Sequence, residues 1–146
     1  MEGDIEQLVR GVFEKGHLMS LATVDENGPW VSDLVYVHDQ EFCLYWISGI
    51  KTRHSEALSR DSRVAATITM SNKSKEPNEG IQVAGHAEKI EGDLLLIATA
   101  YQAKRGRPVP KEGELLKPGQ SWYKLTPTKI ELIYEPLFGF KKQKFK

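Results

Sequence analysis

The chain has 146 residues, of which 40% are hydrophobic and 27% charged, and this composition is typical of a globular protein with a core of its own. Its 20 lysine and arginine residues are balanced by 20 aspartate and glutamate residues, so no overall positive field would attract nucleic acid or an anionic membrane. The single cysteine, Cys43, excludes an internal disulfide, argues against a cysteine-ligated metal site and favours a reducing cytoplasm.

The N-terminal segment predicts one amphipathic helix, because its apolar residues from Ile5 to Phe13 recur at the helical spacing. Asp4 is the expected N-cap of this helix and Gly16 its expected end. The segment lacks a basic region followed by an apolar core, and no run in the chain reaches membrane-spanning length. We therefore expect a soluble protein that is not exported.

The residues that follow predict an antiparallel meander of three strands, the first ending near Val24. The second covers Trp30 to Val37 and the third Phe42 to Ser48, with tight turns at 27–28 and 39–40. The later elements are expected to be a short helix after Ser48, strands at 63–70 and 81–90, a helix at 91–106, a loop at 107–119, and a last pair of strands at 121–135 broken near Pro127.

Many short antiparallel strands with few helices predict a closed or nearly closed β-barrel in a single domain, 1–146. Strands joined by tight turns cannot build the parallel units of a nucleotide-binding α/β fold. The chain also has no Gly-rich fingerprint and no P-loop. A phosphate site must then lie on the rim of the barrel.

The stretch "SGIKTRHSEAL", from Ser48 to Leu58, places three potential cations within four positions, namely Lys51, Arg53 and His54. At a helix N-terminus such a cluster combines free backbone N–H groups, the positive end of the helix dipole and fixed charge, which together suit a phosphate. The alternative is a solvated loop whose charges face water or pair with Glu56.

Three features in order, an aromatic strand, "SGIKTRHSEALSRDSRVAATI" and then "EGIQVAGHAEKI", resemble the pyridoxamine 5′-phosphate oxidase-like flavin proteins, the FMN-binding split barrels. The resemblance extends from Leu18 to Tyr134. It implies a mainly β (α+β) fold, an antiparallel split barrel with a few flanking helices. It also implies a homodimer with FMN at the subunit interface, each phosphate held by the basic turn.

On this resemblance Lys51, Thr52 and Arg53 would bind the phosphate of FMN, and Ile47 and Ser48 at the end of the aromatic strand would meet the ligand. His54 stands where family members commonly carry a lysine, so its contact with the phosphate is expected to be neutral near pH 7.

Gln82 would reach the edge of the isoalloxazine, and Trp122 would contact the flavin from the partner subunit. If its amide is buried in the otherwise apolar strand, Gln82 needs hydrogen-bond partners, since leaving it unpaired costs about 1 to 3 kcal/mol. The alternative is that strand alternation turns Gln82 outward, opposite Val83.

The tail "FGFKKQKFK" lacks the Arg and His pair with which the vitamin-forming oxidases hold the phosphate of their substrate, so that reaction is not assigned. The resemblance implies an FMN-dependent oxidoreductase of unknown substrate and electron donor. No catalytic residue and no metal site are predicted, because the histidines show no ligand spacing. Two alternatives stay open: a split barrel that uses deazaflavin or haem, and a non-catalytic small barrel that binds a nucleotide or single-stranded nucleic acid.

Overall fold

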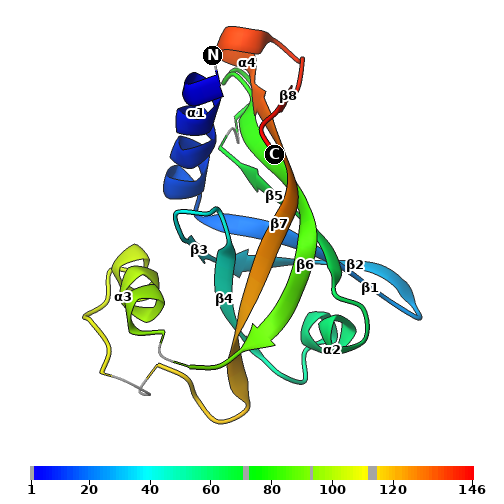
Figure 1. The fold of residues 1–146 in the computed structure, drawn as a ribbon, viewed down its shortest axis with the longest axis vertical. Coiled ribbons are helices and arrows are strands. Elements are labelled where there is room, and N and C mark those ends of the chain that lie inside the picture. The colour runs from blue at the N-terminus through cyan, green and yellow to red at the C-terminus, as the bar shows by residue number, and fades with distance from the viewer. Residues whose placement is uncertain (1, 71–72, 93, 112–114) are drawn as a thin grey trace.

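The computed structural model describes residues 2–70, 73–92, 94–111 and 115–146. Within these residues, eight strands form one antiparallel sheet with four helices around it (Figure 1). The helices are α1 (Glu2–Lys15), α2 (Arg53–Arg60), α3 (Leu95–Lys104) and α4 (Glu135–Phe138). The strands are β1 (Leu18–Asp25), β2 (Gly28–Val35), β3 (Val37–His38), β4 (Leu44–Gly49), β5 (Arg63–Thr69), β6 (Glu79–Ile90), β7 (Gln120–Tyr134) and β8 (Gln143–Lys144).

The strand order shows how the sheet curls into a half-barrel. It runs β2-β1-β5-β6-β7-β4-β3, with β8 on β7. β2 and β3 are the two ends of this order, yet only Tyr36 separates them in the chain, so the sheet curls back on itself into a half-barrel. Tyr36 is fully buried, and its hydroxyl donates a hydrogen bond to the carbonyl oxygen of Phe13 at 2.7 Å. The predicted antiparallel split barrel is confirmed.

The predicted three-strand meander is wrong in its connections. β1 and β2 form the expected hairpin, paired from Leu18 with Val35 to Asp25 with Gly28. β3, however, pairs with β4 and forms the opposite edge of the sheet. The chain changes edge at Tyr36, a step that the spacing of turn residues does not reveal.

The predicted pair of strands around Pro127 is a single strand of 15 residues, β7. Pairing between β6 and β7 shifts register between Ala84 and Gly85: Ala84 lies opposite Lys129 and Gly85 opposite Pro127, which leaves Thr128 as the extra residue of a bulge. A bulge accommodates proline because the ladder there does not require the missing N–H. The local rule that proline ends a strand therefore fails at this position.

Helix α1 ends before Gly16 as predicted, but Asp4 is not its N-cap, because the helix begins at Glu2. Asp4 lies in the first turn instead, where a carboxylate still interacts favourably with the helix dipole. Gly16 donates a backbone hydrogen bond to Val12 at 2.9 Å. A Cβ at Gly16 would overlap the side chains of Ile68 and Tyr36. Glycine therefore allows the end of α1 to pack closely against these two residues of the sheet.

The core has two parts. The inner face of the sheet packs under α1 around fully buried residues, which include Phe13, Met19, Leu21, Trp46, Ile68, Ile81, Leu125 and Leu132. Helix α3 covers the outer face of β3, β4 and β7, where the second cluster contains Val37, Cys43, Tyr45, Ala98, Tyr101 and Trp122. The other outer face stays open, because the outward residues of β5 are all exposed, namely Arg63, Ala65, Thr67 and Thr69.

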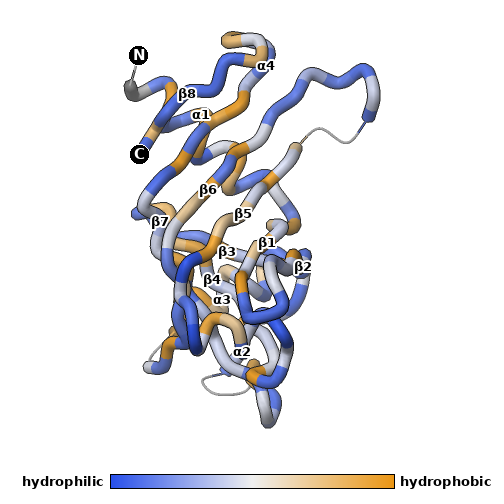
Figure 2. Tube along the Cα trace, turned by 90° about the vertical axis from the view of Figure 1, so that its right-hand side faces the viewer, coloured by the Kyte–Doolittle hydropathy of each residue, from blue (hydrophilic) through white to orange (hydrophobic). Residues whose placement is uncertain are grey.

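Hydropathy follows this arrangement: hydrophobic and hydrophilic colours alternate along β5 and β6, whereas the described residues before β6, 73–78, are hydrophilic (Figure 2). Among the described residues, no helix combines the length and the apolar character needed to span a bilayer. The helix expected at 91–106 is shorter, at Leu95–Lys104, and its expected start includes Asp93, which lies outside the described residues, as do residues 112–114 of the expected loop.

Candidate functional site

The basic turn leads directly from β4 into α2, and Thr52 caps the helix. The Oγ1 of Thr52 accepts a hydrogen bond from the backbone N–H of Ser55 at 3.2 Å and donates to the carbonyl of Gly49 at 3.0 Å. The hydroxyl of Thr52 is therefore used to start the helix. This cap places the positive end of α2 on the rim of the barrel, beside the β1–β2 turn.

Arg53 is held at this rim by a carboxylate and an aromatic ring. Its Nε and Nη2 donate to the two carboxylate oxygens of Asp25 at 2.9 and 3.1 Å. Its guanidinium lies 4.4 Å from the centre of the Trp30 ring. The hydrogen bond from Arg53, together with one from the backbone N–H of Asn27, lowers the pKa of Asp25. The cation is thus fixed in place and partly neutralised.

His54 points the other way, into the protein. Its side chain is buried, with Nε2 2.8 Å from the Oγ of Ser48 and Nδ1 3.3 Å from the Oγ of Ser32. Burial lowers the pKa of His54 from its usual value of 6.5. The structure therefore does not bring the three predicted cations together, because Lys51 is exposed, Arg53 is bound to Asp25 and His54 is buried and neutral near pH 7.

The buried His54 predicts a loss of stability in mild acid. Its pKa is lower in the folded than in the unfolded chain, so between these two values the unfolded chain binds more protons and the free energy of unfolding falls as the pH falls. We expect this loss to begin below pH 6.5 and to be complete below the folded pKa. Urea unfolding of wild type and His54→Gln at a series of pH values checks this. Parallel pH profiles of the two proteins would contradict the prediction.

Ile47 and Trp122 lie on a different surface from Arg53. They face each other across β4 and β7 on the side that α3 covers. Trp122 is only 4% exposed and makes an edge contact with Tyr101 at 5.4 Å between ring centres. Because its ring is packed inside its own chain, Trp122 has little surface left for a flavin bound to a second chain, and its predicted role is not supported by its position.

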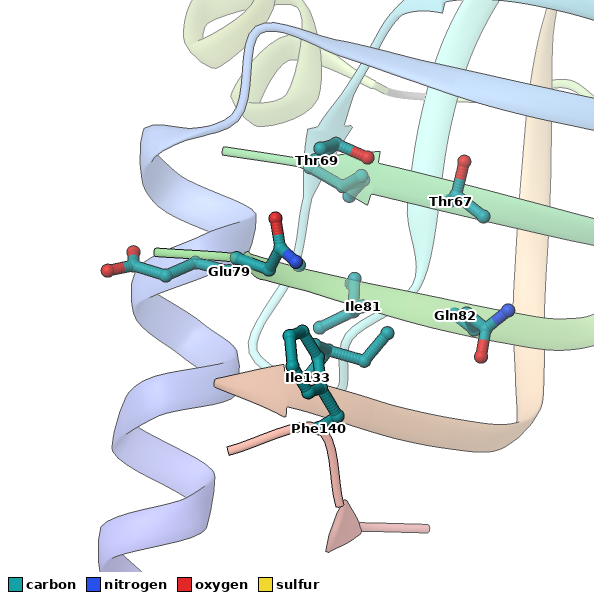
Figure 3. Close-up of a pocket in the computed structure, with 10 residues that line it drawn as sticks. Thr67, Thr69, Glu79, Ile81, Gln82, Ile133 and Phe140 are labelled. Atoms are coloured by element: carbon teal, nitrogen blue, oxygen red, sulfur yellow. The ribbon is translucent and has the colours of Figure 1, made fainter. Parts of the chain in front are cut away.

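Gln82 is exposed, so the expectation of a buried amide is wrong and the outward alternative is correct. Its neighbours Ile81 and Val83 point into the core, as strand alternation requires. Gln82 lines a cavity of about 310 Å³ on the open face of the sheet, together with Thr67 and Phe140 (Figure 3). None of the residues from 47 to 54 contributes to this lining.

The sheet register separates the turn from Gln82. Gln82 pairs with Thr67 and Thr67 with Ser20, whereas Arg53 is bound to Asp25, further along β1. With a rise of about 3.3 Å per residue along a strand and about 4.8 Å between neighbouring strands, the Cα atoms of Asp25 and Gln82 are about 19 Å apart. In one chain, Arg53 and Gln82 therefore belong to separate regions of the sheet.

Sequence analysis missed several residues around these positions. Asp25 and Trp30 lie on either side of the Asn27-Gly28 turn. The unusual feature at this position is a tryptophan at the end of a hairpin, where its side chain is 45% exposed. Phe140 lies in the C-terminal tail, "FGFKKQKFK", whose sequence predicts no site residue. No local pattern connects these residues with the basic turn, because the contacts join distant segments.

Comparison with known proteins gives one family match and a consistent fold. The model of the family described as pyridoxamine 5′-phosphate oxidase matches residues 5–134. A UPF0306 protein of Pasteurella multocida (strain Pm70) is 35% identical over 79 residues, which are 53% of this chain and 53% of that protein. The chain therefore spans about half the length of this relative.

Two solved structures share the fold. General Stress Protein 26 from Bacillus anthracis (strain Sterne) has a TM-score of 0.69 at 15% identity. The match covers 96% of this chain and 98% of the chain of that protein. A heme binding protein from Mycobacterium smegmatis has a TM-score of 0.70 at 19% identity. The match covers 95% of this chain and 56% of the chain of that protein. At these identities the similarity concerns the fold alone.

Proposed function

The chain belongs to the pyridoxamine 5′-phosphate oxidase family, and from this premise we propose that it binds FMN and acts as a flavin-dependent oxidoreductase. FMN would supply the hydride chemistry, and the protein would bind and orient it. The observation that supports this most is Arg53, fixed at the N-terminus of α2 by Asp25 and Trp30.

In this proposal the α2 turn binds the phosphate. The side chain of Arg53 is 34% exposed, and its bonds to Asp25 use Nε and one N–H of Nη2, so further guanidinium donors remain for an anion. Ser55 and Glu56 donate their backbone N–H groups to Thr52, which leaves the N–H groups of Arg53 and His54 for the ligand. Ser48 and His54, which are buried, would support the turn from inside the protein.

The ring of the flavin would then meet the partner subunit. The family resemblance implies FMN at a subunit interface, and the strand spacings put the backbones of Asp25 and Gln82 in one chain about 19 Å apart. We therefore place each FMN between two chains, with its phosphate on the α2 turn of one subunit and its ring near Gln82 of the other. Ala22, Ala65 and Ala84 lie side by side on the open sheet face, and such small side chains allow a second copy to approach closely.

Removal of Arg53 tests the phosphate site. Arg53→Ala is expected to weaken FMN binding by roughly 1.5 to 3 kcal/mol, as for a lost charge-assisted hydrogen bond. Titration of FMN into purified protein, followed by quenching of the flavin fluorescence, measures the effect. The matched control is Arg60→Ala, which removes the same charge from α2 at an exposed residue paired with Glu26 at 3.4 Å.

Two results would refute the phosphate site. One is wild-type protein that does not bind FMN. The other is an Arg60→Ala variant that loses as much affinity as Arg53→Ala, since this would show an unspecific effect of charge. Sedimentation of the FMN complex checks the proposed dimer.

A further inference from the structure

A second cavity, of about 280 Å³, lies between α2 and the sheet. Its walls come from the turn before α2, from α2 itself, and from the end of β6 and the start of β7, which lie beside the helix (Figure 1). The residues that line it are Ile50, Ser55, Glu56, Leu58, Ser59, Glu88, Lys89 and Tyr123.

The second cavity is on the side of α2 that faces away from Arg53. At about 3.6 residues per turn, Arg53 and Arg60 share one side of the helix. There each of them binds a carboxylate at the tip of the β1–β2 hairpin. Ser55 and Ser59 lie on the opposite side, and both line the cavity. The second cavity is therefore separated by the helix from the turn proposed for the phosphate.

Tyr123 brings an unused hydroxyl group to the second cavity. The residue is only 3% exposed, and its ring stacks on Trp46 inside the barrel. Its hydroxyl has no hydrogen-bond partner among the described residues, whereas the buried Tyr36 donates to the carbonyl of Phe13. The hydroxyl is not fully enclosed, and Tyr123 meets the surface at the wall of this cavity. Because a buried phenol usually finds a hydrogen-bond partner, this one is placed to bond to a ligand.

The charges of the lining favour a cation. Glu56 and Glu88 contribute two carboxylates, and Lys89 contributes one ammonium group. In the part of the chain that the structure describes, none of these three side chains forms an ion pair. A positively charged ligand would therefore meet two opposite charges and one like charge, and neither carboxylate would have to leave another partner.

Apolar surface completes the lining. Leu58 is buried under α2, and Ile50, which is 42% exposed, lies in the turn before the helix. The hydroxyl of Ser59 donates to the carbonyl of Glu56 at 2.6 Å, so its oxygen remains free to accept a hydrogen bond. A ligand with an apolar body and one group that donates hydrogen bonds matches this combination.

We propose that the second cavity binds a small organic cation, a primary amine with an apolar body, whose ammonium group is held by Glu56, Glu88 and the hydroxyl of Tyr123. Ile50 and Leu58 would cover the apolar body. A volume of about 280 Å³ suits a ligand with a single ring or a short chain. The proposal does not rest on the binding of FMN, so each of the two sites can fail alone.

Benzylamine is the probe, and benzyl alcohol and benzoate are its neutral and anionic counterparts with the same ring. Each is titrated into the isotope-labelled full chain near neutral pH, and the backbone amide signals are followed by NMR. Benzylamine is expected to bind at least about fivefold more tightly than benzyl alcohol, because charge-assisted hydrogen bonds are the stronger ones. The signals of Ser55, Ser59 and Lys89 should shift during this titration.

Removal of the carboxylates tests the charge of the site. Glu56→Gln and Glu88→Gln are each expected to weaken benzylamine binding about threefold, since both residues are exposed and water screens their charges. The matched control is Glu26→Gln, which removes a carboxylate on the opposite side of α2, paired with Arg60 at 3.4 Å. This control should bind benzylamine as wild type does.

Two further variants test the remaining groups. Tyr123→Phe keeps the ring on Trp46 and removes only the hydroxyl, so it should fold as wild type does and bind benzylamine about threefold more weakly. Lys89→Gln removes the like charge and should strengthen the binding of benzylamine.

Four results would overturn the proposal. They are wild type that does not bind benzylamine, benzoate that binds as tightly as benzylamine, equal losses in Glu56→Gln and Glu26→Gln, and displacement of benzylamine by FMN, which would place the amine in the flavin site. Failure of FMN to bind, with benzylamine still bound, would refute the phosphate site and leave the second cavity intact.

Discussion

Replacement of Gly85 by alanine is expected to destabilise the protein by about 3 kcal/mol or more. A Cβ at this position would overlap the carbonyl oxygen of Thr126 and approach the Cα of Pro127 to 3.0 Å. Both are backbone atoms of β7, so no rotamer change relieves the overlap. To make room for the added Cβ, β6 and β7 would have to separate at the bulge.

Urea unfolding measures this effect, and Gly11→Ala is the matched control. Gly11 lies within α1, and a Cβ there meets no atom within 4 Å. Because alanine is the better helix former, this control should stabilise the chain by up to about 1 kcal/mol. If Gly85→Ala is as stable as wild type, β7 can shift away from β6 and the tight bulge is not required for the fold.

The second large effect is expected for Trp46→Ala, with a loss of about 3 to 5 kcal/mol in the free energy of unfolding. Trp46 is fully buried and stacks on Tyr123 at 5.8 Å between ring centres, with an angle of 14° between the rings. Its removal leaves a large cavity in the centre of the barrel. Trp46→Phe should lose less, because the buried Nε1 of Trp46 has no hydrogen-bond partner among the described residues.

Trp30→Ala is the comparison for this substitution. Trp30 is 45% exposed, and its ring contacts the guanidinium of Arg53. We expect a loss of about 1 kcal/mol or less, because an exposed cation–π contact contributes roughly 0.5 to 1 kcal/mol. Equal losses for the two tryptophans in chemical denaturation would contradict the assignment of Trp46 to the core.

Local patterns predicted most of the elements but not their connections. The alternation in β5 and the turn residues at Asn27-Gly28 depend on neighbours in the sequence, and the strands they predict are present. The edge change at Tyr36 and the unbroken β7 depend on ladders between distant segments. Pro127 ends a strand by the local rule, yet pairing with β6 on both sides of the bulge carries the strand through.

The predicted site was limited in the same way. The spacing in "KTRH" located the start of α2 correctly, but it could not show that Asp25 holds Arg53 or that Ser32 and Ser48 flank His54. For Gln82, alternation already offered the correct outward orientation. The distance between Arg53 and Gln82 follows only from the register of three strands, which no local pattern contains.

The strand order also has a consequence for synthesis of the chain. β1 and β2 can pair as soon as both have left the ribosome, but β4 needs β7, and Leu44 pairs with Leu125, 81 positions later. Closing so long a loop is entropically costly, and contacts of this kind slow folding. Until β7 is made, the apolar residues of β4, including Leu44 and Trp46, lack their final neighbours. The nascent chain is therefore most exposed to aggregation before its last fifth has been translated.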